Sequence, residues 1–235
     1  MLGFVSANGI KTEKNDGMYE KGDGESTNIG VYATLINEKG WFVDFAARNF
    51  WTKLDMTNHA SDGTKLAYKP KRNVFAASIE AGNNFNTEIT GGRFIHIEPK
   101  VELGYMNAAS ANTEVGDSGY QLKYDATNYI NAKAGVLFAY DIKQNNGMLI
   151  QPLLELAYRY EFAGKGDVSY GGAKTESDMS GGTVEINAGL NMQITDDLYW
   201  HGLLGYENGP KEKGWGVHAG IRYAFGGSNL ADKKK

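Results

Sequence analysis

The chain has 235 residues, 31 of them glycine, with 12% aromatic residues, no cysteine and a formal net charge of −4. The lack of cysteine excludes a disulfide framework and any cysteine-based metal or nucleophile site, and the weak charge argues against nucleic acid as a partner. No run approaches the roughly 18 apolar residues of a membrane-spanning helix. A membrane β-barrel is compatible with the mean hydropathy of −0.45, because half of each strand faces water or a polar lumen.

The first residues, MLGFVSANGIKTEK, lack the basic and apolar segments of a secretory signal. If the protein is exported, we therefore expect this sequence to begin inside a longer gene product. Leu2–Lys14 is predicted as a short strand, although its alternation is weak and Gly9 interrupts it. The polar segment Asn15–Thr27 is predicted as a loop because it is rich in turn-forming residues.

Two alternating strands joined by the short turn Asn37–Gly40 come next. Successive side chains of a strand point to opposite faces, so a period of two separates an apolar face from a polar one. Asp44 and Arg48 share the face opposite Trp41, which favours a polar interior on their side. The apolar positions of the two strands are Ile29, Val31, Ala33, Leu35, Trp41, Val43, Phe45 and Ala47.

Seven further strands repeat the alternation. The clearest runs from Ile95 to Tyr105, where His96 and charged residues fill every second position. Pro99 within it removes one donor of the strand ladder. The seven predicted strands cover residues 75–82, 95–105, 130–140, 150–162, 184–192, 197–206 and 215–225.

The connections alternate in length. Long polar loops are predicted after the first, third, fifth and seventh strands, at 15–27, 51–72, 107–127 and 163–181. Short turns follow the second, fourth, sixth and eighth strands, at 37–40, 86–92, 144–147 and 195–197. Outer-membrane barrels have this asymmetry, with short periplasmic turns and longer external loops.

Aromatic residues gather at the strand ends, as the two interfacial girdles of a membrane barrel require. Because a bilayer offers no water to unpaired backbone groups, such strands have to close on themselves. The sequence therefore predicts an all-β, antiparallel transmembrane β-barrel with about ten strands, and a soluble β protein is the alternative fold. The aromatic positions are Trp41, Trp51, Tyr105, Tyr140, Tyr158, Tyr160, Phe162, Tyr206, Trp215, Tyr223 and Phe225.

Three segments carry a resemblance to a known family: IEPKVELGY, IQPLLELAYRYEFAGKGDVSYGG, and TDDLYWHGLLGYENG followed by WGVHAGIRYAF. They resemble the C-terminal translocator barrel of classical (type Va) autotransporters of Gram-negative bacteria. The shared features are the proline-containing strands at Pro99 and Pro152, the step at Glu161–Gly164 and the aromatic-terminated last strand. The resemblance covers most of the chain from about Gly40 onward.

The resemblance implies a 12-stranded outer-membrane barrel with a helix threaded through its pore, which exports and anchors an N-terminal passenger domain by type V secretion. Its implied partners are outer-membrane lipid, the barrel assembly machinery and the passenger in cis. Since ten strands are visible, we expect residues 1–225 to form a barrel that lacks the first two strands and the pore helix. Residues 226–235 are expected to form a polar tail.

The last strand is the expected assembly signal, because the family normally ends on the terminal aromatic that the assembly machinery reads. Here GGSNLADKKK follows that aromatic, which is a departure from the family pattern. The residues of the expected signal are Trp215, Val217, Ala219, Ile221, Tyr223 and Phe225.

Polar residues at the alternate positions are expected to face the lumen, where they would form ion pairs and keep the channel wet. This prediction follows from the strand period. The residues are Asp44, Arg48, Glu80, Glu98, Lys100, Glu102, Lys133, Glu155, Arg159, Glu161, Glu185, His218 and Arg222.

Catalysis is the weaker interpretation of the inward histidines. His96, His201 and His218 could meet Glu98 or Asp44 in an outer-membrane protease arrangement, but they lie within strands rather than at an outer rim. No glycine-rich phosphate loop, metal-spaced cluster or nucleophile elbow is present. We therefore predict no catalytic residue, cofactor or metal, and the alternatives to a translocator are a pore or adhesin-type barrel and, less favoured, a protease barrel.

Overall fold

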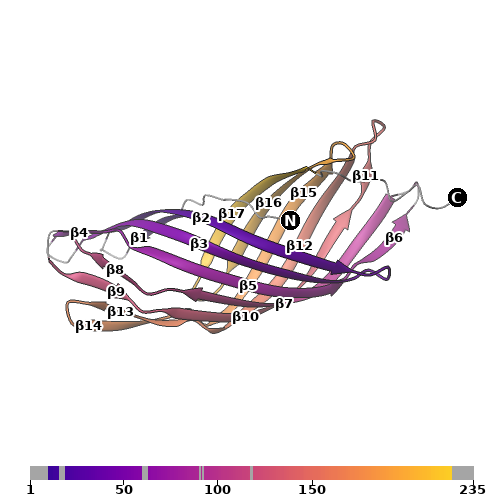
Figure 1. The fold of residues 1–235 in the computed structure, drawn as a ribbon. Coiled ribbons are helices and arrows are strands. Elements are labelled where there is room, and N and C mark those ends of the chain that lie inside the picture. The colour runs from indigo at the N-terminus through magenta and orange to yellow at the C-terminus, as the bar shows by residue number, and fades with distance from the viewer. Residues whose placement is uncertain are drawn as a thin grey trace.

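The computed structural model describes residues 10–15, 19–59, 63–89, 91, 93–116 and 119–223. Its main element is a large antiparallel sheet, which Figure 1 shows strongly curled about one axis. The strand order is β1 (Ile10–Asn15), β2 (Tyr19–Ile36), β3 (Trp41–His59), β5 (Lys71–Asn83), β7 (Arg93–Ala108), β10 (Thr127–Tyr140), β12 (Leu149–Ala163), β15 (Gly181–Gln193), β16 (Leu198–Asn208) and β17 (Lys213–Tyr223).

Three short strands extend this sheet off its main path, and four more form a second sheet. The extensions are β4 (Lys65–Tyr68) on β3, β6 (Phe85–Ile89) on β7 and β11 (Ile142–Lys143) on β12. The second sheet has the order β14 (Ala173–Asp178), β13 (Lys165–Tyr170), β9 (Gln121–Tyr124) and β8 (Ala111–Glu114). No helix in the described part of the chain is long and apolar enough to cross a membrane.

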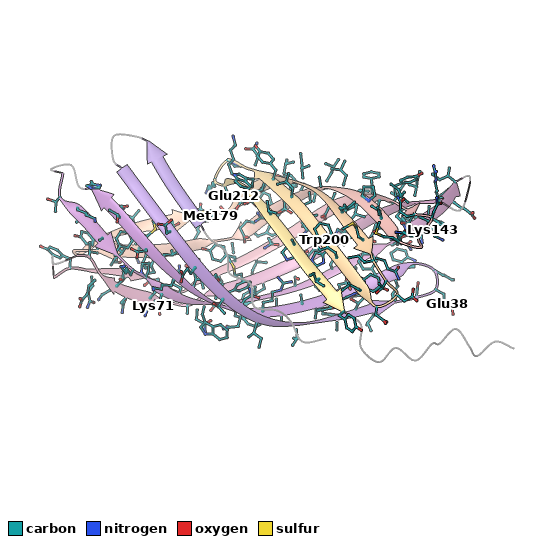
Figure 2. All side chains as sticks on the ribbon, turned by 90° about the horizontal axis from the view of Figure 1, so that it is seen from above. Glu38, Lys71, Lys143, Met179, Trp200 and Glu212 are labelled. Carbon is teal, nitrogen blue, oxygen red and sulfur yellow. The ribbon has the colours of Figure 1, made fainter. Side chains whose placement is uncertain are left out.

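The two ends of the curled sheet differ. At one end lie β4, β8, β9, β13 and β14, and at the other lie β6, β11 and the short turns (Figure 1). We call these the hairpin end and the turn end. In Figure 2, Glu38 and Lys143 mark the turn end and Lys71 lies toward the hairpin end.

The turn Asn37–Gly40 shows why the turn end is tight. Gly40 has a φ of 82°, and its N–H donates to the Asn37 carbonyl oxygen at 3.1 Å. A Cβ at position 40 would lie 2.5 Å from the carbonyl oxygen of Asn84, so only glycine fits without a shift. This turn therefore locks the β2–β3 hairpin against the residue that follows β5.

The prediction that four long polar segments are loops is wrong, because each of them contains strand residues. Residues 107–127 contain β8 and β9, residues 163–181 contain β13 and β14, and β3 continues to His59 within the predicted loop 51–72. β2 likewise begins at Tyr19, inside the predicted loop 15–27, and β6 occupies part of the predicted turn 86–92. These segments are rich in charged, hydroxyl-bearing and turn-forming residues, which obscure the short runs of alternation within them.

The projecting strands form one continuous wall. The bridge between Tyr68 and Val115 and the bond from the Gly116 N–H to the Ala67 carbonyl, at 2.7 Å, connect the β4 region to the β8 region. β2 and β3 contain 18 and 19 residues, whereas a tilted strand crosses a bilayer with about 9–11. The hairpin end therefore extends well beyond the thickness of a membrane.

The sheet ends at β17 on one side and, on the other, at β1 and the part of β2 that β1 does not cover. Among the described residues, β17 pairs only with β16, and β2 pairs only with β3 beyond its short ladder with β1. We call these two edges, β2 over residues 25–36 and β17, the seam. The predicted first strand, Leu2–Lys14, overlaps β1 at 10–14, and its residues 1–9 lie outside the described residues.

Candidate functional site

The curled sheet exposes apolar side chains on one face and shields charged side chains on the other, which is the reverse of the usual arrangement in a soluble protein. Along β7, apolar side chains are solvent-exposed, with Val101 at 59% and Leu103 at 61%. The charged side chains between them are the more buried, since Lys100 is 13% exposed and Glu102 24%. An exposed apolar band of this extent has to be covered by another apolar phase.

Lys100 shows that the polar face is the concave one. Its Nζ lies 3.4 Å from Glu80 on β5 and 3.1 Å from Glu155 on β12. Because β10 stands between β7 and β12, Lys100 and Glu155 meet across it, which is possible only on the inside of the curl. Gly135 of β10 lies opposite Lys100 in the ladder, so no side chain blocks this contact. A second pair, Lys133 with Glu102 at 3.1 Å, joins β10 to β7.

Arg159 organises the hairpin end of the concave face. Its Nε donates to Glu185 at 2.6 Å, and its Nη2 donates to Glu212 at 2.6 Å and to Glu207 at 3.3 Å. Thr183 also donates its hydroxyl to Glu212, at 2.6 Å. One guanidinium thus fastens β15, β16 and the loop before β17 to β12.

The turn end holds a network of hydrogen bonds. His96 Nε2 lies 3.1 Å from Asp141, and its Nδ1 lies 2.6 Å from Asn86 Oδ1. Gln151 donates to Asp141 at 2.9 Å and accepts a bond from Asn191 at 3.1 Å. These contacts join the ends of β6, β7, β12 and β15 on the concave side.

The concave face borders an open hollow of about 660 Å³. Its lining comes from β3, β5, β7, β10, β12 and β15 and from the loops that hold Met179 and Glu212, two residues that Figure 2 labels. Its charged lining residues are Arg48, Glu102, Lys133, Arg159, Glu161, Glu185 and Glu212. We call this charged interior the bore.

Most of the residues expected to face a lumen take part in these contacts. Glu161 is buried and accepts the Ile130 N–H at 2.7 Å, and Glu98 accepts a bond from Asn84 at 2.9 Å. Asp44 lies on the same face of β3 as Arg48 and has a buried Oδ1 without a hydrogen bond. Arg222 is placed differently, because its guanidinium stacks on the Tyr199 ring at 4.2 Å.

In the described residues, the inward histidines make contacts other than those considered for a protease arrangement. His96 contacts Asp141 rather than Glu98 or Asp44. His201 and His218 stack on each other, with ring centroids 5.2 Å apart and planes at 18°. A Cβ on Gly220 would overlap the His201 ring, so glycine at this position permits the stack.

The residues expected to signal assembly lie on the outer face of β17. Trp215, Val217 and Ile221 are among the most exposed large apolar side chains, at 77%, 70% and 63%. Ala219 and Tyr223 lie on the same face, and Phe225 lies outside the described residues. Their role in assembly remains a prediction.

Sequence reasoning missed Asp141, Glu207 and Glu212. Glu207 follows the two-residue period of Tyr199 and His201, so this signal could have found it. Asp141 and Glu212 lie outside the long strands, where no period applies. No group of three or more histidine, aspartate or glutamate side chains fit to hold a metal ion occurs within the described ranges.

Comparison with known proteins finds matches among autotransporters. The family model described as the autotransporter β-domain matches residues 3–205. The pertactin autotransporter of Bordetella bronchiseptica is 26% identical over 209 residues, which are 87% of this chain and 22% of that protein. The BrkA autotransporter of Bordetella pertussis is 25% identical over 226 residues, which are 96% of this chain and 21% of that protein. The chain thus spans about a fifth of the length of these relatives.

Solved structures share the fold. The β domain of the Bordetella autotransporter BrkA superposes with a TM-score of 0.65 at 20% identity, over 94% of this chain and 88% of that one. The translocator domain of the autotransporter NalP from Neisseria meningitidis gives a TM-score of 0.54 at 14% identity, over 94% and 75%. These matches concern the arrangement of the strands.

Proposed function

The chain belongs to the autotransporter β-domain family, and from this premise we propose that it is the outer-membrane barrel that exports and anchors an N-terminal passenger domain by type V secretion. β-domains of this family are outer-membrane β-barrels of Gram-negative bacteria. The prediction of an antiparallel β-barrel fold is confirmed by the sheet and its structural neighbours. The passenger lies in the part of such proteins that this chain does not span.

The inverted polarity of the sheet is the observation that carries the proposal. Side chains such as Leu103 face outward, where they would meet lipid, while Lys100, Glu80 and Glu155 pair along the inner wall of the bore. A hydrated interior is needed because a polypeptide in transit carries polar backbone groups that a hydrocarbon phase cannot satisfy. The ion pairs hold the wall in shape without filling the bore.

Three partners follow from the proposed role. Outer-membrane lipid would cover the apolar outer face, the barrel assembly machinery would read the aromatic end of β17, and the passenger's C-terminal segment would pass through the bore in cis. We propose that residues 1–225 belong to a barrel that two further strands and a pore helix complete. Residues 226–235 would form a tail beyond the assembly signal. The role is transport and anchoring, with no catalytic step assigned to the described side chains.

Export of the passenger by the complete polypeptide tests this function. Val217→Arg places a charge on the lipid-facing side of β17, where such a charge costs about 2–4 kcal/mol near the bilayer midplane. We expect the fraction of passenger that protease reaches on intact cells to fall at least about tenfold. Gly216→Arg is the matched control, because position 216 faces the bore and has no atom within 4 Å of an added Cβ. Equal export by both variants and the wild type would contradict the proposed lipid-facing role of β17.

A further inference from the structure

The concave face borders a second hollow, of about 510 Å³, at the turn end of the sheet. Residues of β12, β15, β16 and β17 line it, together with Tyr32 of β2, and Trp200 marks its position in Figure 2. We call it the turn-end hollow. No aspartate or glutamate of the described chain lines it. The larger hollow is different, because side chains of both signs line it, as the pair Lys133–Glu102 shows.

Arg222 supplies a cation to the turn-end hollow. The Cζ atom of its guanidinium lies 4.2 Å from the ring centroid of Tyr199, which is opposite it in the β16–β17 ladder. Within the described part of the chain, no carboxylate lies in ion-pair range of Arg222. Stacking covers one face of the guanidinium plane and leaves the N–H groups around its rim, which suit the oxygen atoms of a carboxylate or a phosphate.

Two histidines continue the row that Arg222 begins. The rings of His201 and His218 stack, with centroids 5.2 Å apart. A Cβ on Gly220 would overlap the His201 ring, so this ring covers the inward position between His218 and Arg222. A neutral imidazole has one N–H donor, whereas a protonated one has two donors and a positive charge. The three side chains thus form a row of groups that are cationic or become so on protonation.

The strands beside the two histidines add no carboxylate to this row. His201 lies opposite Asn191 on β15 and Gly220 on β17. His218 lies opposite Leu203 on β16. In the described chain, the titratable side chains that line the turn-end hollow are Tyr32, Tyr199, His201 and Arg222.

Amide side chains supply further polar lining. Asn191 donates to Gln151 at 3.1 Å, and Gln151 donates to Asp141 at 2.9 Å. Asp141 also lies 3.1 Å from His96 Nε2, so this carboxylate is already engaged outside the hollow. Gln193 adds another amide at the end of β15. Because amide N–H groups donate to anions, the lining combines a guanidinium with neutral donors.

We propose that the turn-end hollow binds a small anion that carries a phosphate group, with the phosphate oxygens held by Arg222 and His201, and with His218 adding charge beside them. A phosphate suits this row because it presents several acceptor oxygens to the guanidinium fork. Small-molecule sites have volumes of about 300–1,000 Å³, so this hollow has room for a phosphate with an organic substituent. Free phosphate and a phosphorylated solute share this chemistry. The inference rests on the proposed barrel function, which opens the concave face to water.

A phosphate titration of the complete polypeptide in detergent micelles tests the site. Potassium chloride of equal ionic strength serves as the baseline, so that general screening is subtracted. The ring resonances of His201 and His218 in NMR spectra should shift until the site is saturated. Those of His59 and His96 should not shift, because neither residue lines the hollow.

Removal of the guanidinium should weaken binding. We expect Arg222→Gln to raise the Kd for phosphate at least about tenfold, because the charge-assisted hydrogen bonds of the guanidinium are lost. Arg222→Lys keeps the charge without the planar fork and should raise the Kd only about threefold. Lys143→Gln is the matched control, since it removes a positive charge at the turn end from an exposed residue of β11, and it should leave the Kd unchanged.

Sulfate shows whether the histidines take part, because its own charge stays constant between about pH 7.5 and about pH 6, where imidazole titrates. An anion favours the protonated form of a neighbouring imidazole. We therefore expect the Kd for sulfate to fall about three- to tenfold as the pH drops across this range. Replacing His201 and His218 by glutamine should remove this dependence and keep the weaker binding that Arg222 supports. A constant Kd in the wild type would refute the role of the histidines.

Glycerol phosphate separates the two sources of the anion. Tighter binding than that of free phosphate supports a phosphorylated solute, and weaker binding supports free phosphate itself. Equal Kd values for the wild type, Arg222→Gln and Lys143→Gln, or a titration that never saturates, would overturn the proposal.

Unboiled gels separate this failure from a failure of the barrel function, since a folded membrane barrel migrates differently from an unfolded chain. A heat-dependent gel shift without phosphate binding would refute the site alone. A wild-type protein with no such gel shift would refute the barrel function.

Discussion

At the scale of single residues, Arg159 has the largest structural role in the bore. Its three carboxylate partners come from β15, β16 and the loop before β17. One guanidinium therefore offsets the repulsion among three negative charges. Arginine suits this role because its planar fork donates several hydrogen bonds in fixed directions. Without it, Glu185, Glu207 and Glu212 would face one another with no cation between them.

Replacing Arg159 should therefore destabilise the hairpin end. We expect Arg159→Met to cost roughly 2 kcal/mol of unfolding free energy, below the about 3–5 kcal/mol of a fully buried pair because water reaches the bore. Denaturant unfolding in detergent micelles measures this cost. The matched control is Lys165→Met, which removes the exposed pair with Glu176 and should change the unfolding free energy very little. A cost for Arg159→Met no larger than that of the control would show that Arg159 does not stabilise the hairpin end.

Asp178 lies at the end of β14, outside the membrane-spanning part of the sheet. The Ser180 hydroxyl and backbone N–H donate to it at 2.6 and 2.9 Å, and Lys211 lies 3.1 Å away. These contacts, the Ser180 hydroxyl first, hold the pKa of the Asp178 carboxyl well below its ordinary value. A depressed pKa contributes stability above the unfolded-state pKa, about 4, and this contribution is lost only as the pH falls through the lower folded-state pKa.

The hydrogen bonds from Ser180 to Asp178 should therefore survive mild acid. We expect hydrogen-exchange protection of the Ser180 amide to persist from pH 6 down to about 4. Asp178→Asn should reduce this protection already at pH 6, because the carboxylate that accepts both Ser180 bonds is gone. Loss of wild-type protection between pH 6 and 5 would contradict the depressed pKa.

At the scale of elements, adjacent residues of each long strand face two different environments. Leu103 and Glu102 are neighbours on β7, yet one is exposed on the convex face and the other pairs with Lys133 inside the bore. The pleat alone produces this division, because consecutive side chains point to opposite faces. A shift of register by one residue would reverse every position of the strand.

Depth-sensitive labels test this division directly. A spin label at position 103 in lipid vesicles should be accessible to oxygen, which concentrates in the acyl chains, and shielded from a water-soluble nickel reagent. A label at position 102 should show the opposite preference. The labelled cysteines are unique, since the chain has none of its own. Similar polar surroundings at both positions would rule out the membrane-spanning orientation.

At the scale of the whole molecule, the curl produces a bore that ion pairs support but do not fill. The hollow of about 660 Å³ lies beside the Arg159 contacts. Since the wall is braced across β10 by Lys100, the bore should stay open without an occupant. Its conductance then depends on whether a segment is threaded through it.

Conductance in planar bilayers should distinguish these states. The complete barrel domain with its preceding segment should conduct poorly, and removal of that segment while keeping every barrel strand should raise conductance at least about tenfold. We expect Glu155→Leu, made in the barrel without that segment, to make the open conductance level less stable, because Lys100 then loses one of its two ion-pair partners. High conductance with the segment in place would favour a simple diffusion pore instead.

The sequence by itself determined which face of each long strand is apolar, where most of the short turns lie and that the sheet is antiparallel. These features are local, because a period of two and a glycine at a turn such as Gly40 act within a few residues. The resemblance in IEPKVELGY and the last strands predicted the family, and the family match confirmed it. The polar residues of the alternate positions could also be named from the period alone.

Only the tertiary structure decided which of those residues meet. His96 contacts Asp141 and Arg159 gathers Glu212, because the curl and the strand order bring distant segments to one wall. The hairpins β8–β9 and β13–β14 were also hidden from sequence reasoning. Their strands have only 4 to 6 residues, so a period of two covers too few positions to be recognised, and backbone pairing between distant segments is what holds them.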